Sequence, residues 1–242
     1  VAVVARCKHP AEECYLTAEP DENDIKLIRF LARGMSYKDY SSFMSAAMKA
    51  GVDEDEQILR DLFHNFANVP THWSPFGHVT VTFFITAPIF VARQLVKHQV
   101  GFVWNEESRR YKTGRLSFYA PKSWRGAPRT NKQGSSEELG DELQTACYDQ
   151  LESAHKACLS YYRGLIGRGV APEQARMILP LSTMTSWYWT GSLAAWARMV
   201  SQRDRDDVQD ETREVAKQVS SEMAKILPIS WNALLGGGLE TT

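Results

Sequence analysis

Apolar residues recur at helical spacing through much of the chain. Before residue 70, for example, Leu59, Leu62 and Phe66 are three or four positions apart, which places them on one face of a helix. A later run opens at Pro172, where proline suits the first turn, and ends at Pro180. The pattern predicts helices over residues 21–68 in several parts, 137–168, 172–179, 193–202 and 208–227.

Other runs have the composition of β-strands. Residues 79–85 and 184–190 are rich in β-branched and aromatic side chains, and residues 116–119 suit a short strand. Proline, glycine, serine and charged residues dominate 121–136, which predicts a mobile surface loop. No repeat or linker divides the chain. We therefore expect one α+β domain over 1–242, helix-rich around a central antiparallel or mixed sheet, with a helical part over 1–70 and a frayed tail over 236–242.

Composition narrows the classes of partner. Apolar residues make up 43% and charged residues 24%, and the formal net charge is −1, so we expect no nucleic-acid partner and only local phosphate binding. No apolar run reaches the roughly 20 residues that span a bilayer, and the N-terminal residues lack the pattern of a secretory signal. The four cysteines, at positions 7, 14, 147 and 158, form no Cys-x-x-Cys pair. We expect free thiols, no metal site and a cytoplasmic protein without membrane contact.

Candidate chemistry is concentrated in residues 94–111, which follow an apolar run and read QLVKHQVGFVWNEESRRY. A buried polar group without a partner costs about 1–3 kcal/mol, so these side chains must contact either water or a polar ligand. Gln94, Lys97, His98 and Gly101 fall at helical spacing, which predicts that they project from one side of a single helix. The plain alternative is an amphipathic helix that runs into a solvated surface loop.

This segment resembles the signature of the flavin-dependent thymidylate synthases. The family pattern is Arg-His-Arg, seven residues, then Ser-x-Arg-Tyr. Here Lys97-His98-Gln99 is followed by eight residues and then by Ser108-Arg109-Arg110-Tyr111. Further matches, in the family's order, are the His-x-Ser-Pro-x-x-His run at 72–78, the Glu-x-Ala-Arg and Leu-Pro run at 173–180, and the segments 189–192 and 201–203. The resemblance covers about residues 70–235 and implies the family's fold.

The resemblance also implies a reaction. FAD, dUMP and methylenetetrahydrofolate would bind, uracil C5 would gain a methyl group, the reduced flavin would supply the hydride, and NADPH would re-reduce it. Arg203 would be catalytic, because its permanent planar charge suits the O2/N3 edge of uracil; without the resemblance it would read as a helix-surface arginine. The family positions for FAD are His72, Ser74, Lys97, His98, Gln99, Glu106, Ser192 and Arg198. Those for the nucleotide are Gln94, Lys97, Glu106, Glu107, Ser108, Arg109, Arg110, Arg176 and Arg203.

Several positions depart from the family pattern. Where the family has two arginines, Lys97 keeps the positive charge but loses the planar, two-pronged hydrogen-bonding geometry, and Gln99 keeps hydrogen bonding but loses the charge. The family usually has asparagine at the positions of Ser192 and Arg198. Two alternatives to a thymidylate synthase therefore stay open: a related C5 modification of another pyrimidine nucleotide, such as hydroxymethylation, and a nucleotide-binding homologue without catalysis. The resemblance further implies a homotetramer with active sites shared between subunits.

Overall fold

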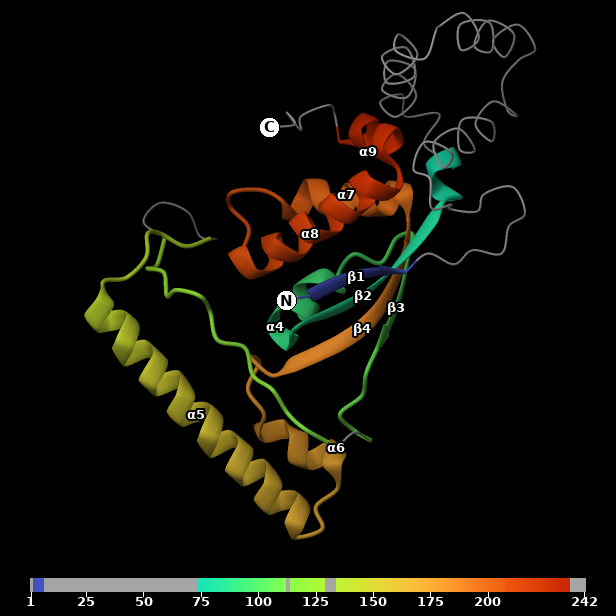
Figure 1. Ribbon diagram of the computed structural model, residues 1–242. Helices are drawn as coiled ribbons and strands as arrows, with labels where there is room; N and C mark the ends of the chain where they lie inside the picture. Colours follow the sequence, from blue (N-terminus) through green and yellow to red (C-terminus); the bar gives the residue numbers. More distant parts are fainter. Residues whose placement is uncertain (1, 7–73, 112–113, 129–133, 236–242) are drawn as a thin grey trace, which may run out of the picture.

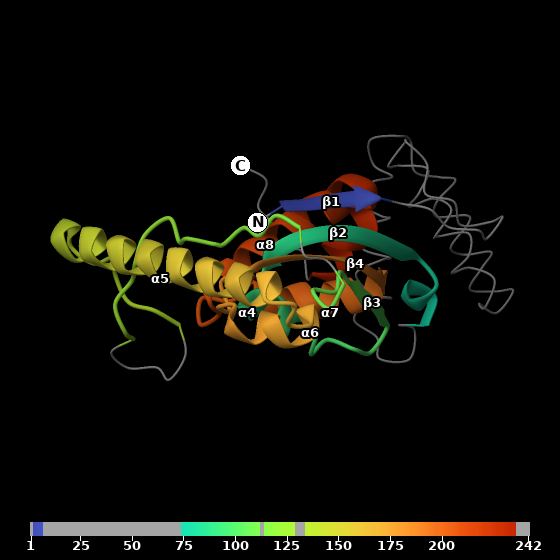
Figure 2. The same cartoon turned by 90° about the horizontal axis from the view of Figure 1, so that it is seen from below.

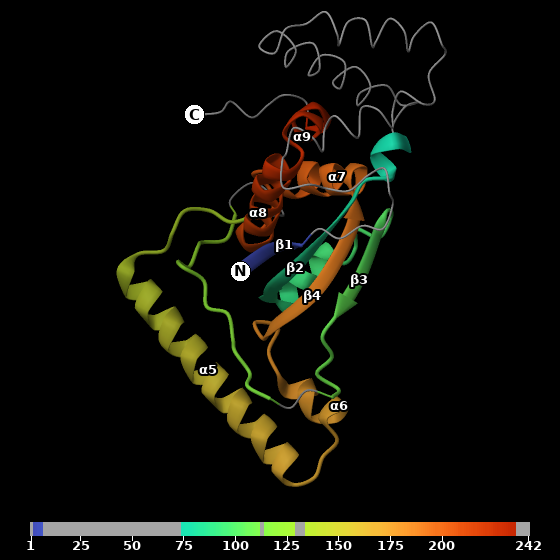
Figure 3. The same ribbon diagram turned by 45° about the vertical axis from the view of Figure 1, so that its right-hand side comes forward.

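Two strands that pair along their full length form the centre of a four-stranded antiparallel sheet. The computed structural model describes residues 2–6, 74–111, 114–128 and 134–235. The sheet order is β1-β2-β4-β3 (Figures 1 and 3). The strands are β1 (Ala2–Arg6), β2 (Thr80–Pro88), β3 (Phe102–Glu106) and β4 (Met184–Ser192). The central pair runs in register from Thr80 opposite Ser192 to Pro88 opposite Met184.

Helices cover the sheet unevenly. They are η2 (Ser74–Gly77), α4 (Ile89–Leu95), α5 (Asp141–Gly167), α6 (Pro172–Ala175), η3 (Arg176–Ile178), α7 (Leu193–Arg203), α8 (Asp210–Ile226) and α9 (Pro228–Leu234). In Figures 1 and 3, α7, α8 and α9 form one layer, whereas α5 lies apart from it; Figure 2 shows α5 extending beyond the sheet. Within the described ranges, no helix combines the length and the apolar character needed to cross a membrane.

The core lies on one face of the sheet. The buried apolar side chains that β2 and β4 contribute to it are Val81, Phe83, Ile85, Ala87, Trp187 and Trp189. They alternate with residues of the opposite face, where the hydroxyls of Thr82 and Thr190 are 2.8 Å apart. The Trp196 ring of α7 packs edge-on against Phe83, with ring centroids 4.8 Å apart. The period-two alternation therefore gives the sheet one apolar face, which α4, α7, α8 and α9 cover.

Most of the expected elements are present, with differences at the edges. The strands expected at 79–85 and 184–190 are β2 and β4, and the expected helices after residue 137 correspond to α5, α6 with η3, α7 and α8. In the range 116–119 only an isolated bridge forms, between Phe118 and Thr183. β1 is a strand within the part expected to be helical. The helices expected over 21–68 and the frayed tail lie outside the described residues.

One expectation is wrong. α4 ends at Leu95, so Lys97 lies in a turn and His98 in the irregular stretch after it, not on one side of a single helix with Gln94. Gly101 has a φ of 81°, which breaks any helix there and starts the chain into β3. The expected mobility of the 121–136 loop stays a prediction. Among its described residues, Arg125 forms an isolated antiparallel bridge with Glu138, and its side chain donates to Glu211 of α8.

Gly191 is the position in the sheet where a side chain has no room. A Cβ atom there would meet the Phe102 ring and the Trp196 indole nitrogen. We expect Gly191→Ala to lower the free energy of unfolding by about 1–3 kcal/mol, because two packed rings must shift. Gly164, in α5, has no atom within 4 Å of its would-be Cβ. Gly164→Ala should therefore be neutral or stabilising by up to about 1 kcal/mol. Denaturant unfolding of both variants is the measurement, and equal stability of the two would contradict the packing.

Candidate functional site

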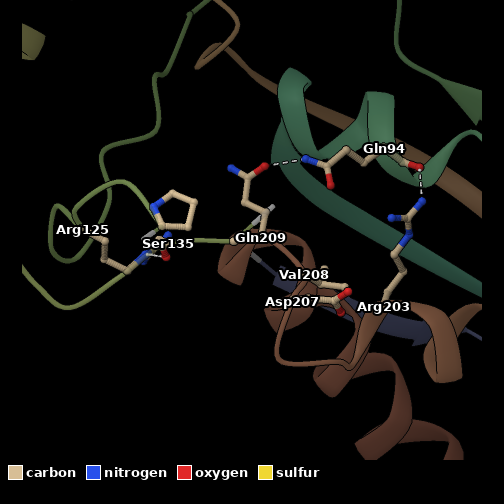
Figure 4. Close-up of a pocket in the computed structure, with 9 residues that line it drawn as sticks. Gln94, Arg125, Ser135, Arg203, Asp207, Val208 and Gln209 are labelled. Carbon is tan, nitrogen blue, oxygen red and sulfur yellow. Dashed lines mark hydrogen bonds between the residues drawn. The ribbon is translucent and has the colours of Figure 1, made fainter. Parts of the chain in front are cut away.

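A pocket of about 490 Å³ opens where three parts of the chain meet (Figure 4). These parts are the end of α4, the connection between α7 and α8, and a hairpin segment, by which we mean residues 121–128 and 134–139. Figure 4 shows Gln209 between Gln94 on one side and Arg125 and Ser135 on the other. The lining residues are Gln94, Arg125, Pro128, Gly134, Ser135, Arg203, Asp207, Val208 and Gln209.

Arg203, the last residue of α7, is held by two acceptors from the segment that follows β2. Its Nε donates to Nε2 of His98 at 2.9 Å, and its Nη2 donates to the backbone oxygen of Gln94 at 3.3 Å. These bonds engage one edge of the guanidinium, and neither of them uses Nη1. Arginine keeps its charge at any ordinary pH, so the pocket wall carries a fixed planar cation.

His98 is neutral beside this cation. Burial, followed by the charges of Arg203 and Arg198, lowers the pKa of His98 from 6.5 to about 4. Because a guanidinium only donates hydrogen bonds, Nε2 of His98 must be the acceptor, and the neutral ring carries its proton on Nδ1. The imidazole therefore orients Arg203 without competing for its charge.

The low pKa of His98 predicts a pH dependence. The folded pKa lies below that of an unfolded histidine, so the folded protein binds fewer protons between pH 6.5 and about pH 4. The stability that neutral His98 contributes is complete above pH 6.5 and is lost as the pH falls towards 4. In an NMR titration we expect its ring signals to move with a midpoint near pH 4. Arg203→Met should raise that midpoint, and a wild-type midpoint at or above 6.5 would contradict the contact.

Gln94 brings an amide group to the same wall. Its Oε1 accepts from the Thr212 hydroxyl at 3.1 Å, and its Nε2 donates to Oε1 of Gln209. Gln94 is half-buried, and Thr212 is fully buried at the start of α8. The structure thus brings three predicted residues together, namely Gln94, His98 and Arg203.

A second group of predicted residues follows the end of β3. Ser108 Oγ accepts from Arg110 twice, from the backbone nitrogen at 3.3 Å and from Nε at 3.2 Å. Glu106 accepts from the Thr185 hydroxyl at 2.8 Å. A guanidinium, a hydroxyl and nearby backbone nitrogens on an exposed turn are the groups that bind a phosphate monoester.

Glu107 and Arg109 lie in the same turn. Their side chains form an ion pair at 3.6 Å, and the backbone nitrogen of Glu107 donates to the oxygen of Ser186. The Nε of Arg109 is buried and has no hydrogen-bond partner among the described residues. These contacts attach the turn to the beginning of β4 and keep the second group in place.

The predicted nucleotide residues therefore form two groups in one chain. Arg203 ends a helix of the layer α7–α9, whereas the chain beyond β3, with Ser108 and Arg110, leads towards α6 (Figures 1 and 3). As far as the chain is described, the pocket lining contains Gln94 and Arg203 but not Ser108 or Arg110. Among the described residues, this pocket therefore brings together only part of the predicted nucleotide set.

The expected flavin residues surround the turn before β3. Lys97 and Gln99 are exposed, and Arg198 donates from Nη2 to the Val100 backbone oxygen at 2.6 Å. One ammonium, one guanidinium and one amide on this surface fit the anionic diphosphate of a dinucleotide cofactor. In this structure the Ser192 hydroxyl caps α7 by accepting from the Ala195 backbone nitrogen at 3.3 Å, and its expected contact with the cofactor stays a prediction.

Three expected residues lie apart from the pocket or outside the description. Arg176 is exposed in η3, where its Nε donates to the Glu173 backbone oxygen at 3.3 Å. Ser74 begins η2, and its side chain is not described. His72 lies outside the described residues.

Sequence reasoning missed the hairpin side of the pocket. Arg125 and Ser135 belong to a segment whose composition predicts a mobile loop, and Gln209 precedes the acidic start of α8. The one available signal is the glutamine itself, an uncharged residue among Asp206, Asp207 and Asp210. Arg125 donates to Glu211, 86 positions along the chain, and no local pattern reveals this contact.

Comparison with known sequences identifies relatives over most of the chain. The model of the family described as thymidylate synthase complementing protein matches residues 17–229. The flavin-dependent thymidylate synthase of Thermus thermophilus is 36% identical over 162 residues, which is 67% of this chain and 58% of that protein's length. The flavin-dependent thymidylate synthase of Streptomyces avermitilis is 30% identical over 211 residues, covering 82% of this chain and 85% of that protein.

Two solved structures of PolB, a UMP/dUMP methylase from Streptomyces cacaoi, share the fold at 26% sequence identity. The structure bound with 5-Br UMP has a TM-score of 0.68 and covers 81% of this chain and 88% of its own. The structure bound with 5-Br dUMP has a TM-score of 0.63, with 84% and 89% covered.

Proposed function

The chain belongs to the thymidylate synthase complementing protein family, that of the flavin-dependent thymidylate synthases, and on this premise we propose that it methylates dUMP to dTMP. Methylenetetrahydrofolate would donate the carbon, FAD would be the cofactor, and NADPH would be the reductant. The observation that carries the proposal is the position of Arg203: a permanent cation oriented by a neutral histidine in the wall of a pocket of about 490 Å³.

Arg203 would make the uracil ring reactive. C5 attacks an electrophilic carbon more readily when negative charge can build up on O2 and N3 of the ring. A preoriented guanidinium at that edge stabilises this charge, and a donor of this kind typically contributes 10²–10³ in rate. Neutral His98 holds the guanidinium through Nε and does not neutralise its charge, so the positive charge of Arg203 remains available to the ligand.

The proposal needs no enzyme thiolate. Cys147 and Cys158 lie on α5, and the described residues that line the pocket include no cysteine. The other two cysteines, at positions 7 and 14, fall outside the described residues. The placement of the described thiols supports activation by charge and not by covalent attachment.

FAD, when bound, would supply the hydride that completes the methyl group. Lys97, Gln99 and Arg198 would hold its diphosphate from the exposed turn before β3. Lys97 contributes a positive charge but lacks the two-pronged hydrogen-bonding geometry of an arginine. This difference would lower the affinity for FAD without abolishing binding. His98 lies between this turn and Arg203, and in its neutral form it can contact an uncharged ring system.

We further infer that the active site is completed by a second copy of the chain, within a homotetramer. Ser108 and Arg110 would bind the phosphate of a nucleotide whose ring lies at Arg203 of another copy; that neither residue lines the pocket of Arg203 supports this arrangement. Exposed apolar side chains support such contacts, since large ones outside the core mark interaction surfaces. Those most exposed among the described residues are Val100, Val103, Tyr111, Leu143, Tyr161, Met177 and Leu181.

A second candidate is methylation of another pyrimidine nucleotide, and one observation favours it. The PolB enzyme, 26% identical to this chain, is a UMP/dUMP methylase and was solved with an analogue of each nucleotide. The ribose 2′-hydroxyl is the only difference between the two substrates, so one donor or acceptor near the sugar would decide the preference. Hydroxymethylation at C5 is a further outcome on the same scaffold.

Mass spectrometry of the product separates these functions. The purified protein with FAD, methylenetetrahydrofolate and NADPH is incubated with dUMP or with UMP. We expect dUMP to gain the mass of one CH2 group and UMP to react more slowly. A gain of one further oxygen would indicate hydroxymethylation, and faster conversion of UMP would favour the second candidate.

Omitting FAD or NADPH from the same reaction is the control, and each omission should abolish product. A protein that takes up no flavin and converts neither nucleotide, while folded by circular dichroism, would contradict the proposed function. It would then favour a nucleotide-binding homologue without catalysis.

A further inference from the structure

Two donors hold the two carboxylate oxygens of Glu106 at the end of β3. The Thr185 hydroxyl donates to Oε1 at 2.8 Å, and the indole nitrogen of Trp104 donates to Oε2 at 3.4 Å. An ionised carboxylate only accepts hydrogen bonds and an indole nitrogen only donates them, so the chemistry of the groups fixes the direction of both bonds. The carboxylate of this exposed residue is therefore held in one place.

The register of the sheet explains this contact. Glu106 lies opposite Trp187 in the antiparallel ladder of β3 and β4. Thr185 precedes Trp187 by two positions, so its side chain is a diagonal neighbour of Glu106 on the same face of the sheet. The adjoining backbone is fixed as well, because the nitrogen of Glu107 donates to the oxygen of Ser186 at 2.9 Å. The beginning of β4 thus positions both the backbone and the carboxylate at the end of β3.

Both donors belong to well-packed parts of the structure. Thr185 is 3% exposed and pairs with Ala87 between the two central strands of the sheet. The Trp104 ring stacks on the Trp187 ring, with centroids 4.5 Å apart and an angle of 19° between the planes. A donor on a rigid element holds its partner more precisely than a donor on a loop does. Glu106 is the flexible member of this arrangement, and its neighbours provide its order.

The held carboxylate can meet a ligand only as an acceptor. Ser108 and Arg110, which we assign to the phosphate, follow Glu106 within four residues. A carboxylate repels a phosphate, so the nucleotide group that Glu106 contacts must be an O–H or N–H donor. A freely rotating glutamate loses rotamer freedom when it binds such a donor, whereas a glutamate that is already held loses less.

We propose that Thr185 is a positioning residue for the nucleotide, because its hydroxyl fixes the Glu106 carboxylate in the place where it accepts from the ligand. The inference rests on the proposed function and on the assignment of Glu106 to the nucleotide that the family resemblance implies. Thr185 is buried, so it acts through Glu106 and not by contact with the ligand. The plain alternative is a buried threonine whose hydroxyl only satisfies a hydrogen bond.

Thr185→Val removes the donor and keeps the branched shape of the side chain. We expect this variant to raise the Kd and KM for dUMP about 5- to 20-fold with kcat within about threefold, because ligand binding must then order the carboxylate. Thr185→Ser keeps the hydroxyl and should bring both constants to within about twofold of the wild type. Calorimetry on the FAD-loaded protein gives the Kd, and the rate of dTMP formation gives KM and kcat.

Thr183→Val is the matched control. Thr183 is also buried, and its hydroxyl donates to the backbone oxygen of Pro180 at 2.6 Å, so this variant loses a buried hydrogen bond that does not involve Glu106. Its Kd for dUMP should match the wild type, whatever the change in melting temperature. A second comparison removes the acceptor. Glu106→Ala should itself weaken dUMP binding, and adding Thr185→Val to it should change the Kd by less than about twofold.

Three outcomes would overturn the role of Thr185. The first is unchanged dUMP affinity in a folded Thr185→Val or Glu106→Ala variant. The second is a loss of affinity that Thr183→Val shares, and the third is a loss that persists in full in the Glu106→Ala background, because neither would act through the carboxylate. A wild-type protein that binds no dUMP would overturn the proposed function together with this proposal, whereas the three outcomes above leave the proposed function in place.

Discussion

Replacing Arg203 with alanine is expected to lower kcat for dTMP formation about 100- to 1000-fold. The guanidinium is fixed by Nε2 of His98 at 2.9 Å and by the Gln94 backbone oxygen at 3.3 Å, so it is oriented before the nucleotide arrives. Removing it takes away the charge that would stabilise the activated ring, whereas the other pocket residues still bind the ligand. The Kd for dUMP should therefore rise much less than kcat falls, by about 10-fold.

Two further variants define what the reaction requires from this position. Arg203→Lys keeps the charge but loses the planar fork, and we expect an intermediate loss of about 10- to 100-fold in kcat. Arg205→Ala is the matched control, because Arg205 is exposed and pairs with Asp207 at 3.0 Å. Its kcat should stay within about twofold of the wild type. Equal activity of Arg203→Ala and the wild type would remove the proposed activation step.

Mixing two inactive variants is expected to restore activity. Arg203→Ala lacks the ring-side group and Arg110→Ala lacks the phosphate-side group, so each homo-oligomer has only defective sites. If every site takes Arg203 from one copy and Arg110 from another, random assembly of equal amounts gives about a quarter of the sites both residues. After the mixed chains are dissociated and reassembled, the dTMP-forming rate should approach about a quarter of the wild-type rate.

A doubly substituted chain provides the control for this experiment. Arg203→Ala mixed with a chain carrying both Arg203→Ala and Arg110→Ala has no copy of Arg203 to offer and should stay inactive. If the two single variants also stay inactive after verified mixing, the site lies within one copy and the shared arrangement is wrong.

The sequence predicted those elements whose pattern is local. In β2 and β4, buried positions alternate with more exposed ones, and the buried positions carry rings such as Phe83 and Trp189. The sequence pattern did not predict β3, because β3 is an edge strand inside a polar segment. Its residue Val103 is 69% exposed, and only the pairing of β3 with β4 defines it as a strand. α9 was not predicted for a different reason: it begins at Pro228, directly after the end of α8 at Ile226, where a proline also suits the end of a helix.

The sequence predicted which residues belong to the candidate site better than it predicted how they are arranged in space. Helical spacing suggested that Gln94 and His98 share one helix, but α4 ends at Leu95, and a turn brings His98 to Arg203, 105 positions along the chain. The resemblance named these residues without showing that they meet. Arg125 and Gln209 remained unnoticed, because their roles follow from contacts between the hairpin segment and α8.

A crystal structure of the FAD-loaded protein with dUMP tests the central claim most directly. We predict the uracil ring at Arg203 and Gln94 of one copy and the phosphate at Ser108 and Arg110 of another. The distances between the ligand and each set of side chains are the quantities to measure. A nucleotide bound by a single copy, or a ring out of hydrogen-bond reach of the Arg203 guanidinium, would contradict the account.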